Sequence, residues 1–244
     1  AGITEEGLQK LSAGEYTLKA VVEETENYKG FSATCDFNVK KAGATDSHSK
    51  VDIEGWTYGS YDGKKNAPSI ASDLNPENQT VQYTYYTDGA CTTQTSTENG
   101  AEAAGGVPKN AGTYYVKAQI PESANYNAGT ATGTFEIKPK EVTVKPDNLQ
   151  KHIGEKDPEL TYTTDGIVKG ETLSGITLQR VSGEDARKYT ITATETAGAN
   201  PNYTVTRETG TFTIEDHNWP KDGKILSPAT SWSEGMKERT CTVP

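Results

Sequence analysis

The chain of 244 residues is poor in the residue types that usually build a broad hydrophobic core or a chemical site. It contains four phenylalanines, three tryptophans, three cysteines, three histidines and one methionine, and 32% of its residues are hydrophobic. No apolar stretch approaches the roughly 18 residues of a membrane-spanning helix, so no membrane insertion is expected. The 13 tyrosines and 24 glycines favour thin β-sheets with many turns over an enzyme core.

The scarcity of histidine argues against catalysis. His48, His152 and His217 fall in a predicted linker, a loop and a module junction, and none joins a Ser or Cys in a catalytic arrangement. No His-Glu-x-x-His spacing for zinc occurs, and no calcium-loop pattern occurs. The 34 carboxylates are too numerous to single out a glycosidase pair. We therefore predict no enzymatic activity, no catalytic residue, no metal and no cofactor.

The charge balance excludes another class of partner. Lysine and arginine number 24, and the formal net charge is −10. Such a chain is repelled by a polyanion and shows no basic stripe, so nucleic acid is not an expected partner. The acidic balance itself is a common device for solubility.

One motif occurs three times and organises the rest of the chain. Each copy has a tyrosine-led run, then Asn-Tyr, then a run containing a phenylalanine; the three copies start at residues 12, 110 and 185. The first and second tyrosines are 12, 12 and 14 residues apart, and the phenylalanine follows 9 residues later in each copy. An internal repeat of this kind defines the architecture before any single residue is considered.

Both runs of the motif alternate apolar and polar residues with period two, as half-buried antiparallel strands do. The tyrosines that start the first run and the phenylalanines of the second are predicted to face inward and hold each unit: Tyr16, Tyr114 and Tyr189, with Phe37, Phe135 and Phe212. The Ala-Gly-x-Tyr lead-in resembles the tyrosine corner of immunoglobulin-like domains, which implies a tyrosine hydroxyl bonded back to the chain. The immunoglobulin disulfide positions are Leu18, Val116 and Ile191 here, so the resemblance concerns the sandwich alone.

The motif sets the predicted domain organisation. We expect the second half of a truncated Ig-like repeat over residues 1–42, a linker over 43–50 and complete units over 51–139 and 140–216. Residues 217–244, with Cys241, look like the start of a further cysteine-bearing module. The sequence begins within a repeat, so we expect a piece of a longer chain. The short Lys138-Pro139-Lys140 junction predicts an elongated, semi-rigid tandem.

Several local expectations follow. Cys35 aligns with Gly133 and Gly210 on the inward face, so it is expected to be a buried, inert thiol. Cys91 lies in a polar, turn-like stretch without an apparent partner, and residues 91–107 are expected to form an exposed loop. Every lysine is expected to be solvated. An intramolecular Lys–Asn bond, known in sandwiches of Gram-positive surface proteins, has no candidate trio in the sequence.

Particular motifs support a family resemblance. Residues 51–139, with Gly-Trp-Thr-Tyr-Gly at 55–59 and Asn-Ala-Pro at 66–68, resemble bacterial Ig-like repeats of large Firmicutes surface proteins. Residues 140–216, with Gly-Glu-Lys-Asp-Pro at 154–158 and Gly-Glu-Thr-Leu-Ser-Gly at 170–175, resemble MBG ("mostly beta, glycine") domains of bacterial adhesins. The resemblance implies an extracellular, multi-domain protein of a bacterial cell surface, with no catalytic residues.

Two hypotheses about function remain. The first is a structural and interaction role, as stalk or spacer repeats of an adhesin-like protein, monomeric within a longer chain and partnered by a host or microbial surface protein or glycan. The second is a glycan-binding module that uses the aromatic residues Trp56, Tyr58 and Tyr61. Stacking on a carbohydrate requires rings exposed in a groove, whereas a core role buries them.

Overall fold

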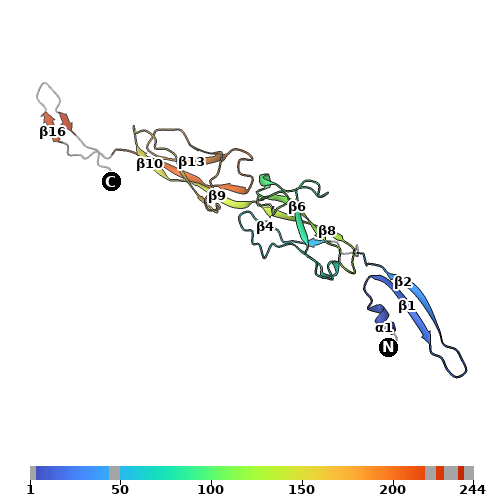
Figure 1. Cartoon of the computed structure of the whole chain (residues 1–244). Coiled ribbons are helices and arrows are strands. Elements are labelled where there is room, and N and C mark those ends of the chain that lie inside the picture. Colours follow the sequence, from blue (N-terminus) through green and yellow to red (C-terminus); the bar gives the residue numbers. More distant parts are fainter. Residues whose placement is uncertain (1–3, 44–49, 218–223, 228–235, 239–244) are drawn as a thin grey trace. The chain divides into compact units, whose positions relative to one another are not determined.

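A computed structural model describes residues 4–43, 50–217, 224–227 and 236–238 of the chain. The described part is built mainly of strands, and its contacts divide the chain into two compact units, residues 1–138 and 139–244 (Figure 1). The predicted all-β class with tandem modules is confirmed. None of the described helices is long and apolar enough to cross a membrane.

The first unit begins with the first copy of the motif. A short helix, α1 (Glu5–Gln9), precedes β1 (Gly14–Val22), which pairs antiparallel with β2 (Phe31–Val39). The Ala13 N–H donates to Asn125 Oδ1 at 2.7 Å, and this hydrogen bond links the base of the hairpin to the second copy of the motif.

The remainder of the first unit forms two sheets. Its strands are β3 (Val51–Asp52), β4 (Trp56–Thr57), β5 (Ser69–Ile70), β6 (Gln82–Tyr86), β7 (Gly112–Ile120) and β8 (Gly129–Lys138), with short 3-10 turns η2 (Ser72–Leu74) and η3 (Thr97–Asn99). One sheet has the order β4-β8-β7-β6, and β3 pairs with β5 in the other. The two motif strands, β7 and β8, therefore occupy the centre of the larger sheet.

The second unit repeats this plan. Its strands are β9 (Lys140–Pro146), β10 (Leu149–His152), β11 (Tyr162–Asp165), β12 (Ile176–Arg180), β13 (Lys188–Glu195), β14 (Tyr203–Arg207) and β15 (Thr209–Glu215). One sheet has the order β10-β15-β13-β12, and the other has the order β11-β9-β14. Strands β16 (Lys224–Ser227) and β17 (Met236–Glu238) form a further hairpin. Cys241, which marks the predicted cysteine-bearing module, lies outside the described residues.

The sequence predicts antiparallel sheets, whereas the sheets of the structure are mixed. The motif strands do pair antiparallel, β7 with β8 and β13 with β15. However, β4 joins β8, β10 joins β15 and β14 joins β9 as parallel neighbours. A parallel neighbour requires a long connection, which the intervening residues of each repeat supply. Period-two patterning identifies a strand but not the direction of its partner.

The three tyrosines that begin the motif make the same hydrogen bond. Each hydroxyl donates to the carbonyl oxygen four residues earlier: Tyr16 to Ser12 at 2.8 Å, Tyr114 to Asn110 at 3.0 Å, and Tyr189 to Asp185 at 3.0 Å. This is the geometry of a tyrosine corner, and it fixes the chain at the entry to the central strand.

The inward faces of the second and third copies form the cores of the two units. Val116, Ala118 and Ile137 are fully buried in the first unit, as are Ile191 and Phe212 in the second. Tyr114, Phe135, Tyr189 and Ile214 are at most 6% exposed. The predicted alternation is therefore correct in both complete copies.

Residues 91–107 differ from the exposed loop that we predicted. Thr95 is fully buried, and its N–H donates to the Tyr85 carbonyl at 3.0 Å. The Thr95 hydroxyl donates to the Gly106 carbonyl at 2.6 Å, and the Tyr85 N–H donates to the Gly105 carbonyl at 3.0 Å. The loop thus pairs with the outer edge of β6, because buried backbone groups there need hydrogen-bond partners.

The prediction for Cys35 is wrong. Cys35 is exposed, and so are Leu18, Val22 and Phe31 on the same hairpin. The alternation of this first copy is correct in register, since Tyr16 pairs with Phe37 as Tyr114 pairs with Phe135. Among the described residues, no second sheet covers its apolar face as one covers the other two copies, and Tyr16 and Phe37 on that face are half-buried.

Candidate functional site

At one equivalent position beside the motif phenylalanine, the first unit has an aromatic residue and the second unit has a lysine. In the first unit Trp56 pairs with Ile137, two residues beyond Phe135. In the second unit Lys151 pairs with Ile214, two residues beyond Phe212. Both pairs are parallel, so Trp56 and Lys151 are structural equivalents. Each is buried, with 7% and 6% of the residue exposed.

A second shared position lies on the opposite outer strand. Tyr85 on β6 pairs with Val116, two residues beyond the corner tyrosine Tyr114. Arg180 on β12 pairs with Ile191, two residues beyond Tyr189. The aromatic pair of the first unit, Trp56 and Tyr85, is therefore replaced by two cations in the second unit.

In the first unit these positions build an aromatic cluster of Trp56, Tyr61, Tyr85, Tyr114 and Phe135. The Trp56 ring stacks on Phe135 with centroids 5.1 Å apart, and the Tyr85 ring meets Phe135 edge-on at 5.9 Å. Tyr114 lies 5.9 Å from Phe135, and Tyr61 lies 4.9 Å from Trp56. Aromatic pairs at such distances add about 0.5–1.5 kcal/mol each beyond burial. This cluster stabilises the sheet by packing.

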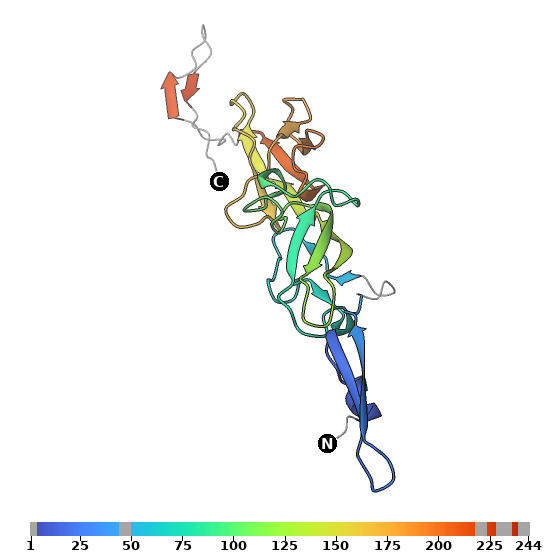
Figure 2. The ribbon, with the colours of Figure 1, turned by 45° about the vertical axis from the view of Figure 1, so that its right-hand side comes forward.

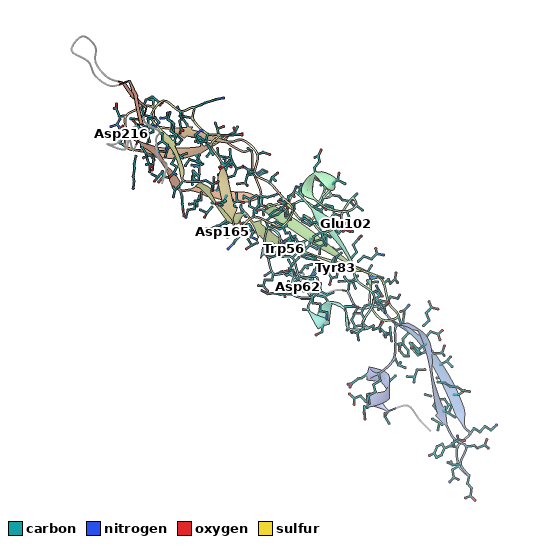
Figure 3. The ribbon with its side chains drawn as sticks, turned by 90° about the vertical axis from the view of Figure 1, so that its left-hand side faces the viewer. Trp56, Asp62, Tyr83, Glu102, Asp165 and Asp216 are labelled. Atoms are coloured by element: carbon teal, nitrogen blue, oxygen red, sulfur yellow. The ribbon has the colours of Figure 1, made fainter. Side chains whose placement is uncertain are left out.

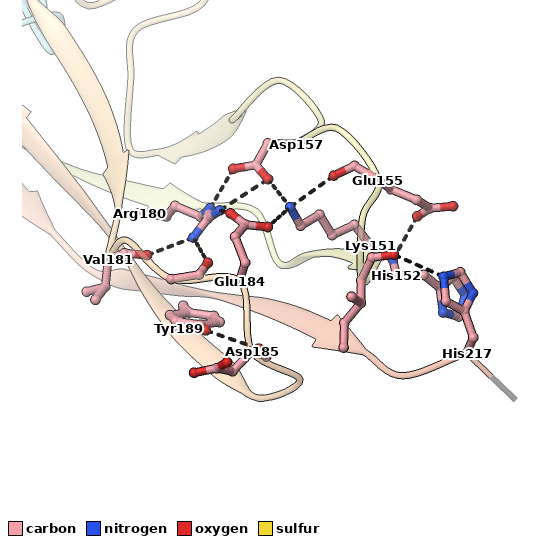
Figure 4. Close-up of polar contacts among 12 residues, drawn as sticks. Lys151, His152, Glu155, Asp157, Arg180, Val181, Glu184, Asp185, Tyr189 and His217 are labelled. Carbon is pink, nitrogen blue, oxygen red and sulfur yellow. Dashed lines mark hydrogen bonds and ion pairs between the residues drawn. The ribbon is translucent and has the colours of Figure 1, made fainter.

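In the second unit the same positions build an ion cluster of Lys151, Asp157, Arg180 and Glu184 (Figure 4). Lys151 Nζ lies 2.7 Å from Asp157 and also contacts Glu184. Arg180 lies 2.5 Å from Asp157 and 2.6 Å from Glu184. The Arg180 guanidinium also stands 4.8 Å above the Phe212 ring, where it takes a place among the aromatic rings that Tyr85 takes in the first unit.

The donors of the ion cluster are already in use. Lys151 Nζ donates to Asp157, to Glu184 and to the Glu155 carbonyl. Arg180 donates from Nε and Nη2 to the two carboxylates, and from Nη1 to the carbonyls of Val181 and Gly183 at 2.9 Å. Two cations and two anions make the cluster neutral. It can tie β10 to β12 across the central strands, but it offers no free cation to a ligand.

The family comparisons assign both units. A model described as MBG domain matches residues 55–141, and a model described as MBG domain (YGX type) matches residues 142–213. Residues 55–213 are two tandem MBG domains. The Ig-like assignment of the first unit thus becomes an MBG assignment, in agreement with its shared sheet order. No curated protein matched the chain.

The family indicates the general kind of function. MBG domains are non-catalytic modules and are typical of the repeats of bacterial surface proteins, and no enzyme family matched the chain. Among the described residues, no three His, Cys, Asp or Glu side chains gather as metal ligands would.

The electrostatics of the second MBG domain keep its ion cluster charged. Hydrogen bonds from Arg180 and then Lys151 lower the pKa of Asp157 to about 2. Bonds from Lys151 and then Arg180 lower the pKa of Glu184. The Asp157 and Glu184 carboxylates raise the pKa of Lys151. An amide bond from Lys151 to a side-chain carboxyl would need an uncharged amine, so this environment opposes such a crosslink.

These shifts predict that acid weakens the second MBG domain. A carboxylate with a depressed folded-state pKa contributes stability that is present above its unfolded pKa, near 4 for Asp, and lost as pH falls toward the folded value of about 2. We expect the protection factors of the Ile191 and Ile214 amides, which correct the observed exchange rates for their intrinsic pH dependence, to fall mainly between about pH 4 and pH 2. Asp157→Asn should exchange faster at pH 7 and change less across that window. Equal pH profiles for the two proteins would contradict this role of Asp157.

The three residues of the glycan-binding hypothesis differ in how far they are exposed. Trp56 is in the core of the first MBG domain (Figure 3). In the same domain Tyr58 is half-buried and Tyr61 is 41% exposed. The Trp56 and Tyr61 rings meet at 55°, so they do not form a coplanar platform. Glycan binding stays a prediction that rests on Tyr61 and the groove beside Trp56, which is lined by residues such as Thr57, Ser60 and Lys65.

Sequence reasoning missed the ion cluster altogether. Lys151 was expected to be solvated like every other lysine, whereas 4% of its side chain is exposed. The signal lay in the alternation of Leu149, Lys151 and Ile153, which places the lysine on the inward face of a short strand. No sequence pattern indicates that Arg180, Asp157 and Glu184 converge on it from 6 to 33 residues away.

Proposed function

We propose that this chain is a non-catalytic, load-bearing segment of an extracellular bacterial surface protein, in which the MBG domains act as stalk or spacer repeats of an adhesin. The proposal rests on one observation. In both domains the inward-facing residues at the two equivalent outer-strand positions are engaged in packing or in ion pairs within the domain. Trp56 and Tyr85 pack on Phe135, and Lys151 and Arg180 bind Asp157 and Glu184. Such positions stabilise a domain and leave its partners to other parts of the protein.

The strand arrangement supports a mechanical role. The second domain is entered through β9 and left through β15, and each of these strands is flanked on both sides within its sheet. Both also have a parallel neighbour, β14 for β9 and β10 for β15. Tension along the chain would therefore shear several hydrogen bonds at once, whereas an edge strand could be peeled away one bond at a time.

Single-molecule stretching of the full chain tests this proposal. We expect two separated unfolding steps, each releasing about 25–30 nm, because a domain of roughly 75–90 residues extends by about 3.5 Å per residue. Phe212→Ala should lower the unfolding force of the second domain's step and preserve the other step. Smooth extension without discrete steps would overturn the load-bearing role. In this proposal, a protein or glycan of a host or microbial surface is bound by other regions of the protein, which the stalk presents.

A further inference from the structure

Asn125 of the first MBG domain binds both ends of the β1–β2 hairpin, which is drawn in blue in Figure 2. Its side-chain oxygen Oδ1 accepts a hydrogen bond from the N–H of Ala13, which directly precedes β1, at 2.7 Å. Its carbonyl oxygen accepts one from the N–H of Ala42, beyond the end of β2, at 2.8 Å. The Asn127 N–H then donates to the Ala42 carbonyl at 2.9 Å. The first copy of the motif is therefore joined to the domain around Asn125.

The far side of the Asn125 amide is bound by the domain itself. Nδ2 donates to Glu77 Oε1 at 2.6 Å, and both residues are half-buried. A carboxylate only accepts and a backbone N–H only donates, so the two partners fix which end of the amide faces each of them. Hydrogen bonds to a charged carboxylate are also stronger than neutral ones. The amide thus links Ala13 of the hairpin to Glu77 of the domain in a single orientation.

The turn that contains Asn125 does not itself require asparagine. Asn27 and Asn125 are third in the equivalent turns 25–28 and 123–126, and a backbone hydrogen bond between the first and fourth residues closes each turn. Asparagine is common in turns because it tolerates a positive φ, but neither of these residues has one. Asn27 is exposed. The turn therefore gives no reason for Asn125, whereas the hydrogen bonds across the junction do.

The second MBG domain receives the chain in the same way. Ala42 and Lys140 are equivalent, because each lies three residues beyond the partner of the glycine that opens the motif strand. Ala42 forms a parallel bridge with Tyr126, and Lys140 pairs parallel with Tyr203. The Lys140 N–H donates to the Asn202 carbonyl at 2.9 Å, which is the bond that Ala42 makes in the first domain. The Asn-Tyr pair of a copy thus binds the segment that leaves the copy before it.

An ion pair lies at the same junction but contributes less. Lys41 Nζ donates to the Ser123 carbonyl at 2.8 Å and pairs with Glu122. The Lys41 and Glu122 side chains are 33% and 58% exposed, and ion pairs at such positions contribute little because water screens them. Joints between compact parts of a chain move unless an extensive interface holds them. Orientation at this junction therefore depends on the few directed hydrogen bonds around Asn125.

We propose that Asn125 is a positioning residue, whose side chain fixes the orientation of the first motif copy on the first MBG domain. The backbone bonds at Ala42 attach the chain at one end of the hairpin only. The bond from Ala13 adds a second point of attachment at the other end, and Glu77 holds the amide that accepts it. In this role the Asn-Tyr pair couples successive copies of the motif. The coupling sets the angle at the junction whether or not the chain bears load.

Distances between two spin labels on the full chain test the proposal. The labels replace Lys19 on β1 and Gln119 on β7, which are both exposed. We expect one narrow distance distribution, which Asn125→Ala should broaden by about twofold. Asn27→Ala removes the equivalent asparagine of the first copy and should leave the distribution unchanged. All variants have the native cysteines replaced by Ser, namely Cys35, Cys91 and Cys241.

A reciprocal exchange of donor and acceptor separates the side-chain bonds from a simple loss of volume. Asn125→Asp keeps an acceptor for the Ala13 N–H but sets two carboxylates against each other, so it should broaden the distribution as well. Adding Glu77→Gln supplies an amide donor to the new carboxylate and should restore the narrow distribution. Amide protection at Val116 and Ile137, which are fully buried, shows that the first MBG domain stays folded.

Three results would overturn the proposal. The first is an unchanged distribution in Asn125→Ala. The second is equal broadening by Asn27→Ala, which would assign the effect to the turn and not to the junction. The third is a double variant with a distribution as broad as that of Asn125→Asp, which would exclude the bond to Glu77 as the cause. If Asn125→Ala lowers the amide protection at Val116, the single and double variants, compared at equal protection, decide in its place.

Discussion

Replacing Phe212 by Ala is expected to remove a large part of the stability of the second MBG domain and to leave that of the first unchanged. Phe212 is fully buried, it pairs with the corner tyrosine Tyr189, and its ring lies beneath the Arg180 guanidinium. Removing a buried phenylalanine side chain typically costs about 3–5 kcal/mol, because the apolar contacts are lost and a cavity remains. A domain of this size has a total stability of only about 5–15 kcal/mol.

The same substitution at Phe37 is the matched control. Phe37 has the same partner in its motif, Tyr16, but no second sheet in the described part of the chain covers its hairpin, and the residue is half-buried. Phe37→Ala should therefore cost less than about 1 kcal/mol, as changes at poorly packed positions do. Urea unfolding followed by amide exchange of each domain measures both effects. Similar losses of unfolding free energy for the two variants would contradict the role of burial beneath a second sheet in setting the cost of removing the motif phenylalanine.

Gly133→Ala is expected to have the second large effect. The new Cβ would lie 2.3 Å from the Val51 carbonyl oxygen and 3.0 Å from the Val51 Cβ. The first contact is with backbone, which cannot rotate away, so β3 must move off β8. Overpacking of this kind costs about 1–3 kcal/mol, and sometimes more. The unfolding free energy of the first MBG domain should fall by that amount.

Gly63→Ala provides the control in the same domain. A Cβ at Gly63 meets no atom within 4 Å, so the change should alter stability by less than about 0.5 kcal/mol. Urea denaturation monitored by tryptophan fluorescence, in a background with the other two tryptophans, Trp219 and Trp232, replaced by Phe, reports on this domain, since Trp56 lies in its core. A loss for Gly63→Ala as large as that for Gly133→Ala would contradict the close approach of Val51.

The repeat made much of the fold predictable. Alternation in two runs placed Tyr114 and Phe135, and Tyr189 and Phe212, on inward faces, and both pairs lie directly opposite each other in the sheets. The tyrosine lead-in predicted the corner geometry that all three copies share. These features were accessible because strands of 7 to 10 residues contain enough alternations to define their faces.

The outer strands were less predictable, because they are short. β4 contains two residues, Trp56 and Thr57, and two residues define neither a period nor a direction. The parallel pairing of β4 with β8 depends on where the chain returns after a long connection, which alternation does not encode. Residues 91–107 look like a polar loop for a similar reason: Thr95 is buried because β6 needs backbone partners, and its own side chain gives no sign of it.

Burial in the first copy could not be judged from the motif alone. Cys35 occupies an inward position by register, yet burial also requires a second layer above it. The ion cluster presents the converse case, in which a polar residue is buried because partners converge from other elements. Lys151 is enclosed only because Asp157 and Glu184 reach it from a loop and from the segment after β12. The periodicity of a strand can be predicted from a single sequence, but the residues distant in sequence that pack against it cannot.

The exchange of aromatic rings for ion pairs bears on how neighbouring repeats fold correctly. Two adjacent domains with one sheet plan are at risk of trading equivalent strands while they fold. If β10 took the place of β4 beside β8, Lys151 would enter the rings around Phe135 without its carboxylates, at the high cost of an unpaired buried charge. In the reverse exchange Trp56 would replace Lys151 beside Asp157 and Glu184, and the two carboxylates would keep only Arg180 as a cationic partner. The two domains have similar backbones but different core residues. This difference disfavours the exchange of strands between them during folding, so each domain pairs with its own strand.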